Sequence, residues 1–283
     1  MWLIPPFIFT LTLIFTLFGT GKAVDCIPKV IAYTITVGKP GYGKFDRIQA
    51  AIDSIPSQNN RWIRIAVSPG LYSEKVTVPR EKTCVILQGN SREDTVISWN
   101  AHSITNLSAT FTSFADNFVA KNIAFKNTYT NGKSINGGST IKQSLAVELV
   151  GDKSSFLECG FYAFQDTLWD VVGRHYFRNC YIQGAVDFIW GNGQSIYEKC
   201  VISVLPLPGG VGTGFITAQG RNSLNENSGF VFKGCNVLGI DDTTRTYLGR
   251  AYGAYSTVIW YKTQFSNVIV PQGWQAWHYV NQE

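Results

Sequence analysis

The sequence predicts an all-β protein built as a parallel β-helix, with a short helix capping its N-terminal end. Two observations carry this prediction. The 283 residues include 27 Gly and are rich in Val, Ile, Phe, Tyr and Thr, which favours strands over helices. A pattern with a period near 20 residues indicates stacked units, none of which can bury its apolar face alone.

The repeat places an aromatic residue three positions before a cysteine. Its four copies are Phe156/Cys159, Phe177/Cys180, Tyr197/Cys200 and Phe232/Cys235. The cysteines are 21, 20 and 35 residues apart, and the longest spacing indicates an external loop inserted at 205–214. A short alternating run follows each cysteine, so strands are expected at 160–162, 181–183, 201–203 and 236–238. A weaker earlier copy begins at Phe118.

The N-terminal elements differ from the repeat. Residues 1–23 contain one uncharged apolar block and are expected to be a secretory signal peptide, with an uncleaved signal anchor as the alternative. Residues 46–55 carry apolar side chains at helical spacing before Pro56, which predicts the capping helix. Strands at 63–68 and 85–89 are expected to form the first rungs. The single domain is therefore expected to cover residues 24–283.

Composition limits the function classes. Only 15% of the residues are charged and 45% are hydrophobic, which argues against a coiled coil or a disordered chain. The net charge of +5 is too small to indicate nucleic-acid binding. No cluster of Cys and His indicates a metal site, and no metal or cofactor is expected.

An exported chain permits disulfides, so the state of its six cysteines stays open. Cysteines aligned on successive rungs would act as small apolar core residues, and disulfide bonding is the alternative. Asn106 begins a possible N-glycosylation sequon, whose use the sequence leaves open.

Polar residues follow the same period. Asp166 and Asp187 are 21 residues apart, and Gln143 and Gln165 are 22 apart. On neighbouring parallel strands, about 4.8 Å apart, the two carboxyl groups would meet. Like charges that close raise one pKa and leave one acid and one base. The alternative is a stack of Asp, Asn and Gln side chains that only stabilises turns.

Six motifs in order make the chain resemble plant pectin methylesterases (pectinesterases). They are Gly70–Glu74, Gln143–Val147, Gln165–Leu168, Asp187–Gly191, Thr217–Arg221 and Leu248–Tyr252. The resemblance implies the single-stranded, right-handed parallel β-helix of pectin-lyase-like proteins. It also implies a carboxylic ester hydrolase that removes methyl esters from the galacturonate units of pectin.

The resemblance also implies the roles of individual residues. Asp187 is expected to be the nucleophile, Asp166 the acid and base, and Arg250 the partner that orients Asp187 and lowers its pKa. Gln165 and Gln143 are expected to stabilise the oxyanion. Substrate contacts are expected from Thr105, Gln143, Arg250, Tyr252, Phe164 and Trp190, with Trp274 as a further candidate; core packing is the alternative role of the aromatic ones. Tyr72 and Glu74 are expected to be structural and to brace the cleft.

The sequence departs from the family at three places. Tyr252 stands where Trp is usual, which predicts weaker sugar stacking. Ser144 and Leu145 replace the usual Ala and Val, which alters the packing beside Gln143. Family members usually continue beyond the position of Glu283, so the C-terminal tail is expected to be missing.

The expected partner is methyl-esterified pectin, with a proteinaceous inhibitor as a second partner. The protein is expected to be a secreted monomer of the cell wall that contacts no nucleic acid and, after signal cleavage, no membrane. A catalytically impaired pectin-binding protein, or another pectin-active β-helix enzyme such as a lyase or glycosidase, remains the alternative. Carboxyl groups about 5 Å apart would also suit a retaining glycosidase.

Overall fold

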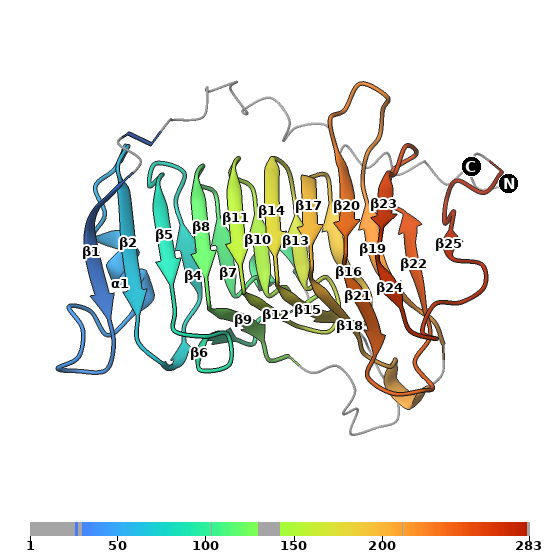
Figure 1. The fold of residues 1–283 in the computed structure, drawn as a ribbon, viewed down its shortest axis with the longest axis horizontal. Helices are drawn as coiled ribbons and strands as arrows, with labels where there is room; N and C mark the ends of the chain where they lie inside the picture. Colours follow the sequence, from blue (N-terminus) through green and yellow to red (C-terminus); the bar gives the residue numbers. More distant parts are fainter. Residues whose placement is uncertain (1–25, 28–29, 103, 130–141, 211, 282–283) are drawn as a thin grey trace, which may run out of the picture.

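The computed structural model describes residues 26–27, 30–102, 104–129, 142–210 and 212–281. Within these ranges the chain winds through three parallel sheets, and from β2 onward strands three apart in sequence lie side by side (Figure 1). The predicted parallel β-helix is therefore confirmed. The segment predicted to be a signal peptide lies outside the described residues. No helix of the described part is long and apolar enough to cross a membrane.

Each coil contributes one strand to each sheet. Sheet A contains β1 (Ile31–Val37), β2 (Trp62–Val67), β5 (Val85–Gln88), β8 (Phe118–Lys121), β11 (Ser154–Leu157), β14 (Arg174–Arg178), β17 (Gln194–Glu198), β20 (Gly229–Lys233) and β23 (Val258–Tyr261). Sheet B contains β3 (Gly70–Ser73), β6 (Thr95–Trp99), β9 (Ala124–Asn127), β12 (Gly160–Tyr162), β15 (Tyr181–Gly184), β18 (Val201–Val204), β21 (Asn236–Gly239) and β24 (Gln264–Phe265).

Sheet C carries the residues that matter for function. It contains β4 (Val76–Val78), β7 (Phe111–Ser113), β10 (Val147–Leu149), β13 (Leu168–Asp170), β16 (Val186–Gly191), β19 (Gly214–Gln219), β22 (Thr246–Ala251) and β25 (Trp274–Gln275). The remaining elements are the helices α1 (Ile48–Asp53) and α2 (Thr105–Ser108) and the 3-10 turn η1 (Pro208–Gly210), which lies in the predicted external loop.

The aromatic–cysteine repeat forms the core. Phe156, Phe177, Tyr197 and Phe232 pair in register on sheet A, and successive ring centroids lie 5.2, 4.5 and 4.6 Å apart. The four cysteines of the repeat are buried and free, which confirms the expected thiol stack. The earlier copy was misaligned by two residues, because Ala120 rather than Phe118 pairs with Phe156.

One disulfide was not predicted. Cys26 is bonded to Cys84, 58 residues further on. It ties the segment before β1 to the residue that precedes β5. Neither cysteine belongs to the repeat, so the sequence pattern carried no sign of this pairing.

Helix α1 covers the N-terminal end of the coil stack, as predicted, and buries Ile48, Ala51 and Ile52. Two buried side chains from later coils hold it. The Glu74 carboxylate accepts hydrogen bonds from the N–H groups of Ile48 (2.7 Å) and Gln49 (3.1 Å). At the other end, the Lys82 ammonium donates to the carbonyl groups of Ile52, Asp53 and Ile55. The two charges match the helix dipole.

Tyr72 and Glu74 therefore have a structural role, but a different one from the expected brace of the cleft. Glu74 holds α1, and the Tyr72 hydroxyl donates to the Ser68 carbonyl 2.8 Å away.

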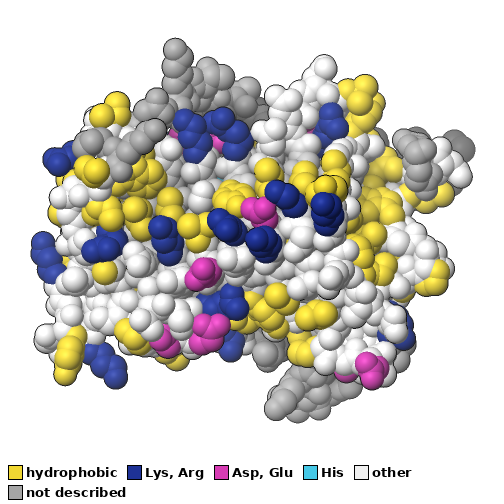
Figure 2. All heavy atoms as spheres, in the orientation of Figure 1, with side chains coloured by type: hydrophobic (Ala, Val, Ile, Leu, Met, Phe, Trp, Pro, Cys, Tyr) yellow, Lys and Arg dark blue, Asp and Glu magenta, His cyan; other side chains and the backbone are white. Residues whose placement is uncertain are grey.

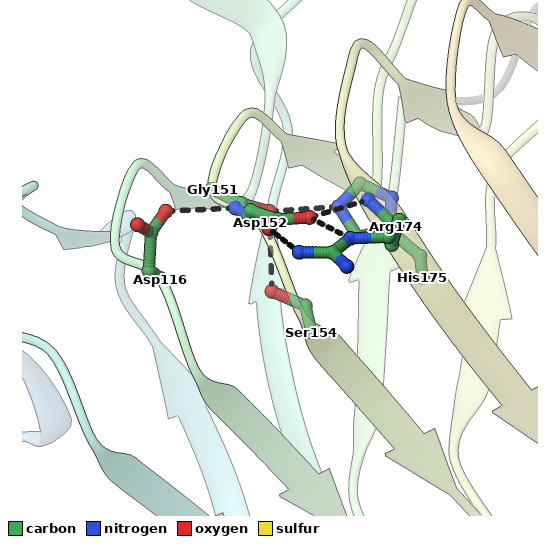
Figure 3. Close-up of polar contacts among 6 residues, drawn as sticks. All are labelled: Asp116, Gly151, Asp152, Ser154, Arg174 and His175. Carbon is green, nitrogen blue, oxygen red and sulfur yellow. Dashed lines mark hydrogen bonds and ion pairs between the residues drawn. The ribbon is translucent and has the colours of Figure 1, made fainter. Parts of the chain in front are cut away.

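Polar contacts fix the turns that lead from sheet C into sheet A. Asp116 accepts from the Asp152 N–H at 2.8 Å, and Asp152 in turn accepts from the N–H and guanidinium of Arg174 (Figure 3). The Arg174 hydrogen bond lowers the pKa of Asp152 to about 2. Each coil thus holds the next through a side-chain bond as well as its strand pairing.

His175 lies beside this chain of contacts inside the coil. Its Nε2 contacts the Gly151 carbonyl at 2.8 Å, and its Nδ1 contacts the Asp170 carboxylate. Burial opposes the charge, but Asp170 and the carbonyl outweigh it and raise the pKa of His175. Tyr197 donates to the other Asp170 oxygen at 2.7 Å, so the end of β13 is fixed from two sides.

The outer face of sheet A is basic. Its outward positions include Lys121, Arg178 and Lys233, all at least partly exposed. Figure 2 shows Lys and Arg side chains in a row across this face.

We expect Glu74→Ala to lower the free energy of unfolding by about 2 kcal/mol, because two buried helical N–H groups lose their acceptor. Glu74→Gln keeps one acceptor oxygen and should cost less. Urea denaturation measures both. Glu81→Ala, at an exposed glutamate, is the control. Equal stability of Glu74→Ala and the control would contradict the role of Glu74 in holding α1.

Candidate active site

Asp166 and Asp187 lie on neighbouring coils. Gln165 forms a parallel bridge with Val186, and the Asp166 N–H donates to the Val186 carbonyl at 3.1 Å. This register places Asp166 beside Asp187 at the strand spacing of about 4.8 Å. Both residues have positive φ, 61° and 47°, so the backbone turns locally where each carboxyl group is presented. The expected alignment of the two aspartates is confirmed.

Gln143 and Gln165 follow a spacing one residue longer. The Ser144 N–H donates to the Gln165 carbonyl at 3.2 Å, whereas the N–H groups of Ala146 and Val147 both donate to Thr167. Two donors on one carbonyl are typical of a bulge, which absorbs the additional residue. Gln143 is thereby brought level with Gln165 and not with Phe164. The Gln165 side chain also donates a hydrogen bond to Asp166.

Arg250 reaches the pair from β22. Its Nε donates to Asp187 Oδ1 at 2.8 Å, and its Nη2 donates to Oδ2. A bidentate bond of this kind fixes both the position and the plane of the carboxylate. The expected partnership of Arg250 with Asp187 is present in the structure.

The two carboxyl groups have different electrostatic surroundings. Burial and the nearby Asp187 charge raise the pKa of Asp166 to about 8. Burial also raises the pKa of Asp187, while Arg250 acts in the opposite direction. The expected net lowering of the Asp187 pKa was therefore wrong, because desolvation outweighs the guanidinium. The Arg250 bond nevertheless favours Asp187 as the ionised member, which leaves the proton on Asp166.

Aromatic rings form a row next to the carboxyl pair. Trp169 stacks on Trp190 at 4.5 Å, Trp190 meets Tyr252 at 6.0 Å, and Tyr252 meets Trp277 at 6.0 Å. Trp190 and Tyr252 were predicted as groove residues, whereas Trp169 and Trp277 were missed. The spacing of 21 between Trp169 and Trp190, equal to that of the aspartates, was the available signal.

Two predicted aromatic residues lie outside this row. Phe164 is half-buried and makes none of the ring contacts found among the described residues; its carbonyl accepts from the N–H groups of Ala185 and Val186. Trp274 lies on β25 against Gly249, where a Cβ would come within 2.5 Å of the indole ring. Gly249 is thus required by close packing.

Thr105 begins helix α2, in a segment that a missed residue, Asn127, attaches to the site. The Asn127 side-chain amide donates to the carbonyl groups of Ala101, Ser108 and Leu145. It therefore joins the α2 segment to the chain just after Gln143. The departures Ser144 and Leu145 are fully buried there, so they change core packing, as expected, and not the groove surface.

Among the described residues no group of three or more His, Cys, Asp or Glu side chains is arranged to hold a metal ion.

We expect Asp187→Asn to lower the pKa of Asp166 from about 8, because the neighbouring negative charge is removed. Carbon-13 NMR of aspartate-labelled protein would follow the Asp166 carboxyl in both variants. Asp242→Asn, at an exposed aspartate, is the control. An Asp166 pKa unchanged by Asp187→Asn would show that the two carboxyl groups do not interact.

The family model that matches is Pectinesterase, over residues 34–282. Probable pectinesterase 55 of Arabidopsis thaliana is 46% identical over 265 residues, which cover 91% of this chain and 79% of that protein. Probable pectinesterase 29 of the same plant is 45% identical over 254 residues, covering 88% and 74%.

Solved structures give the same result. A pectin methylesterase from carrot matches with a TM-score of 0.78 and 31% identity, covering 85% of this chain and 76% of that one. A pectin methylesterase in complex with a hexasaccharide matches with a TM-score of 0.76 and 26% identity, covering 85% and 81%. The likeness extends to the right-handed parallel β-helix. The chain belongs to the pectinesterase family.

Proposed function

We propose that this chain is a pectin methylesterase, which hydrolyses methyl esters on the galacturonate units of pectin and releases methanol and pectate. The observation that carries the proposal is the buried aspartate pair, in which Arg250 binds one carboxylate and the pKa of the other is raised to about 8. Family membership supports it, as does the solved relative that holds a hexasaccharide.

The first half of the reaction forms an acyl-enzyme. The Asp187 carboxylate, held by Arg250, attacks the ester carbonyl carbon. The side-chain amides of Gln143 and Gln165 donate hydrogen bonds to the oxyanion that develops, where each such donor typically contributes about 3 kcal/mol. The bond between carbon and the methoxy oxygen then breaks, and protonated Asp166 supplies the proton that makes the leaving group methanol.

The second half restores the enzyme. Asp166, now ionised, takes a proton from water, and the hydroxide attacks the acyl carbon. The bond to Asp187 breaks, which returns an ionised Asp187, a protonated Asp166 and a free galacturonic acid. The glutamines beside the pair and the family membership favour this route over the lyase and glycosidase alternatives.

The groove and the partners follow from the same proposal. Trp190 and Tyr252 offer ring faces to sugar units, and Thr105 lies on the adjoining α2 segment. The basic face of sheet A and the net charge of +5 suit an anionic polysaccharide. We also propose a secreted monomer that acts in the cell wall, which the Cys26–Cys84 disulfide and the apolar N-terminal block support. A proteinaceous inhibitor as a further partner rests on the family resemblance alone.

Asp187→Ala should lower methanol release from highly methylated pectin on the order of 10³-fold or more, because the nucleophile is lost. Asp242→Ala should retain full activity, since that side chain is exposed and plays no part in the reaction. Headspace methanol measurement tests both. Release at the wild-type rate by Asp187→Ala would overturn the proposed function.

The rate at saturating substrate should fall on both sides of a maximum. Asp166 acts in its protonated form, so activity is lost as the pH rises past about 8. Asp187 acts ionised, so activity is lost as the pH falls through its raised pKa, above the ordinary value of 3.8. Initial rates corrected for alkaline hydrolysis without enzyme give the profile. Activity that stays constant to pH 10 would rule out Asp166 as the acid.

A further inference from the structure

Arg250 lies between two aromatic rings. The carbon at the centre of its guanidinium is 3.8 Å from the Trp277 ring centroid and 4.3 Å from that of Phe215. Stacking of this kind covers the two faces of the guanidinium plane and leaves its N–H edge available. That edge carries both hydrogen bonds to Asp187.

The two rings are held by different means. Phe215, on β19, stacks on Tyr247 with centroids 5.2 Å apart and planes 6° from parallel. Trp277 comes from a turn two residues beyond Gln275, the register partner of Arg250 on β25. A hydrogen bond from the Tyr279 N–H to the Ala276 carbonyl closes that turn at 2.9 Å.

Trp277 has a backbone conformation that a bulky residue rarely adopts. Its φ is 52°, in the left-handed region that favours glycine. Such conformations persist where the surrounding structure enforces them, and they gather at functional sites. Here the turn places the indole over the guanidinium.

We propose that Trp277 is a positioning residue, which holds Arg250 in the plane where its fork binds Asp187. Without the indole, one face of the guanidinium is open to water and the long side chain regains other rotamers. The charged groups that face Asp187 are Arg250 and Asp166. A displaced Arg250 therefore leaves Asp187 close to a like-charged group with a weaker counterion. The inference rests on the proposed function for its kinetic consequences, but not for the titration of Asp187.

The first test compares the pH dependence of kcat for methanol release in Trp277→Leu, Trp277→Phe and the wild type. We expect Trp277→Leu to lower kcat about tenfold and to move the acidic limb of the profile up by about one pH unit, because Asp187 loses part of its counterion. Trp277→Phe keeps a ring face and should stay within about twofold of the wild type. Tyr261→Leu removes a half-exposed ring that also carries a nearby cation, Lys262, away from the site, and should leave the profile unchanged.

A double-mutant cycle separates positioning from direct sugar binding. In an Arg250→Lys background, Trp277→Leu should have less than about a twofold further effect, since the two residues act together. If Trp277 binds sugar instead, Trp277→Leu raises KM, leaves the acidic limb in place and adds its full effect in that background. Those three results would overturn the inference.

The second test does not depend on turnover. Carbon-13 NMR of aspartate-labelled protein should show a higher Asp187 pKa in Trp277→Leu than in the wild type and in Tyr261→Leu. An Asp187 pKa equal in all three folded proteins would overturn the inference even if no methanol is released. Absence of methanol from the wild type, with a raised Asp187 pKa in Trp277→Leu, would instead count against the proposed function alone.

Discussion

The register between neighbouring coils of sheet C determines the whole candidate site. Six successive rungs supply its parts in order: Gln143 before β10, Gln165 and Asp166 before β13, Asp187 on β16, Phe215 on β19, Arg250 on β22, and Trp277 after β25. Because side chains alternate between the two faces of a strand, a slip of one residue would turn any of these groups to the other side of the sheet. Residues 134 positions apart thus meet within a few strand spacings.

That register creates an electrostatic conflict and also resolves it. Two carboxyl groups on adjacent coils, both largely buried, cannot both be ionised at low cost. A proton on Asp166 and the Arg250 guanidinium on Asp187 remove the conflict in two different ways, and the difference is what an acid–nucleophile pair needs. The positive φ of both aspartates and the rings around Arg250 show how much of the surrounding structure serves to hold these groups in place.

The sequence was sufficient for features that repeat. The period near 20 located the coils, the buried thiols of the repeat, and the pairing of Asp166 with Asp187. It failed where one residue acts on a distant part of the chain only once. Glu74 and Lys82 hold α1 from later coils, Asn127 attaches the α2 segment, and Cys26 bonds Cys84; no spacing marks any of these contacts. Trp277 was missed because its place depends on an unusual φ, whereas the better-marked Trp274 packs against Gly249.

The most direct measurement is a crystal structure of the Asp166→Ala variant with a methyl-esterified galacturonate oligosaccharide. The central claim is that coil register brings the nucleophile, the oxyanion donors and the guanidinium to one ester group. The account predicts the ester carbonyl carbon next to an Asp187 oxygen, its carbonyl oxygen within hydrogen-bond distance of the Gln143 and Gln165 amides, and sugar rings along Trp190 and Tyr252. An oligosaccharide bound elsewhere, or with its ester group turned away from Asp187, would contradict it.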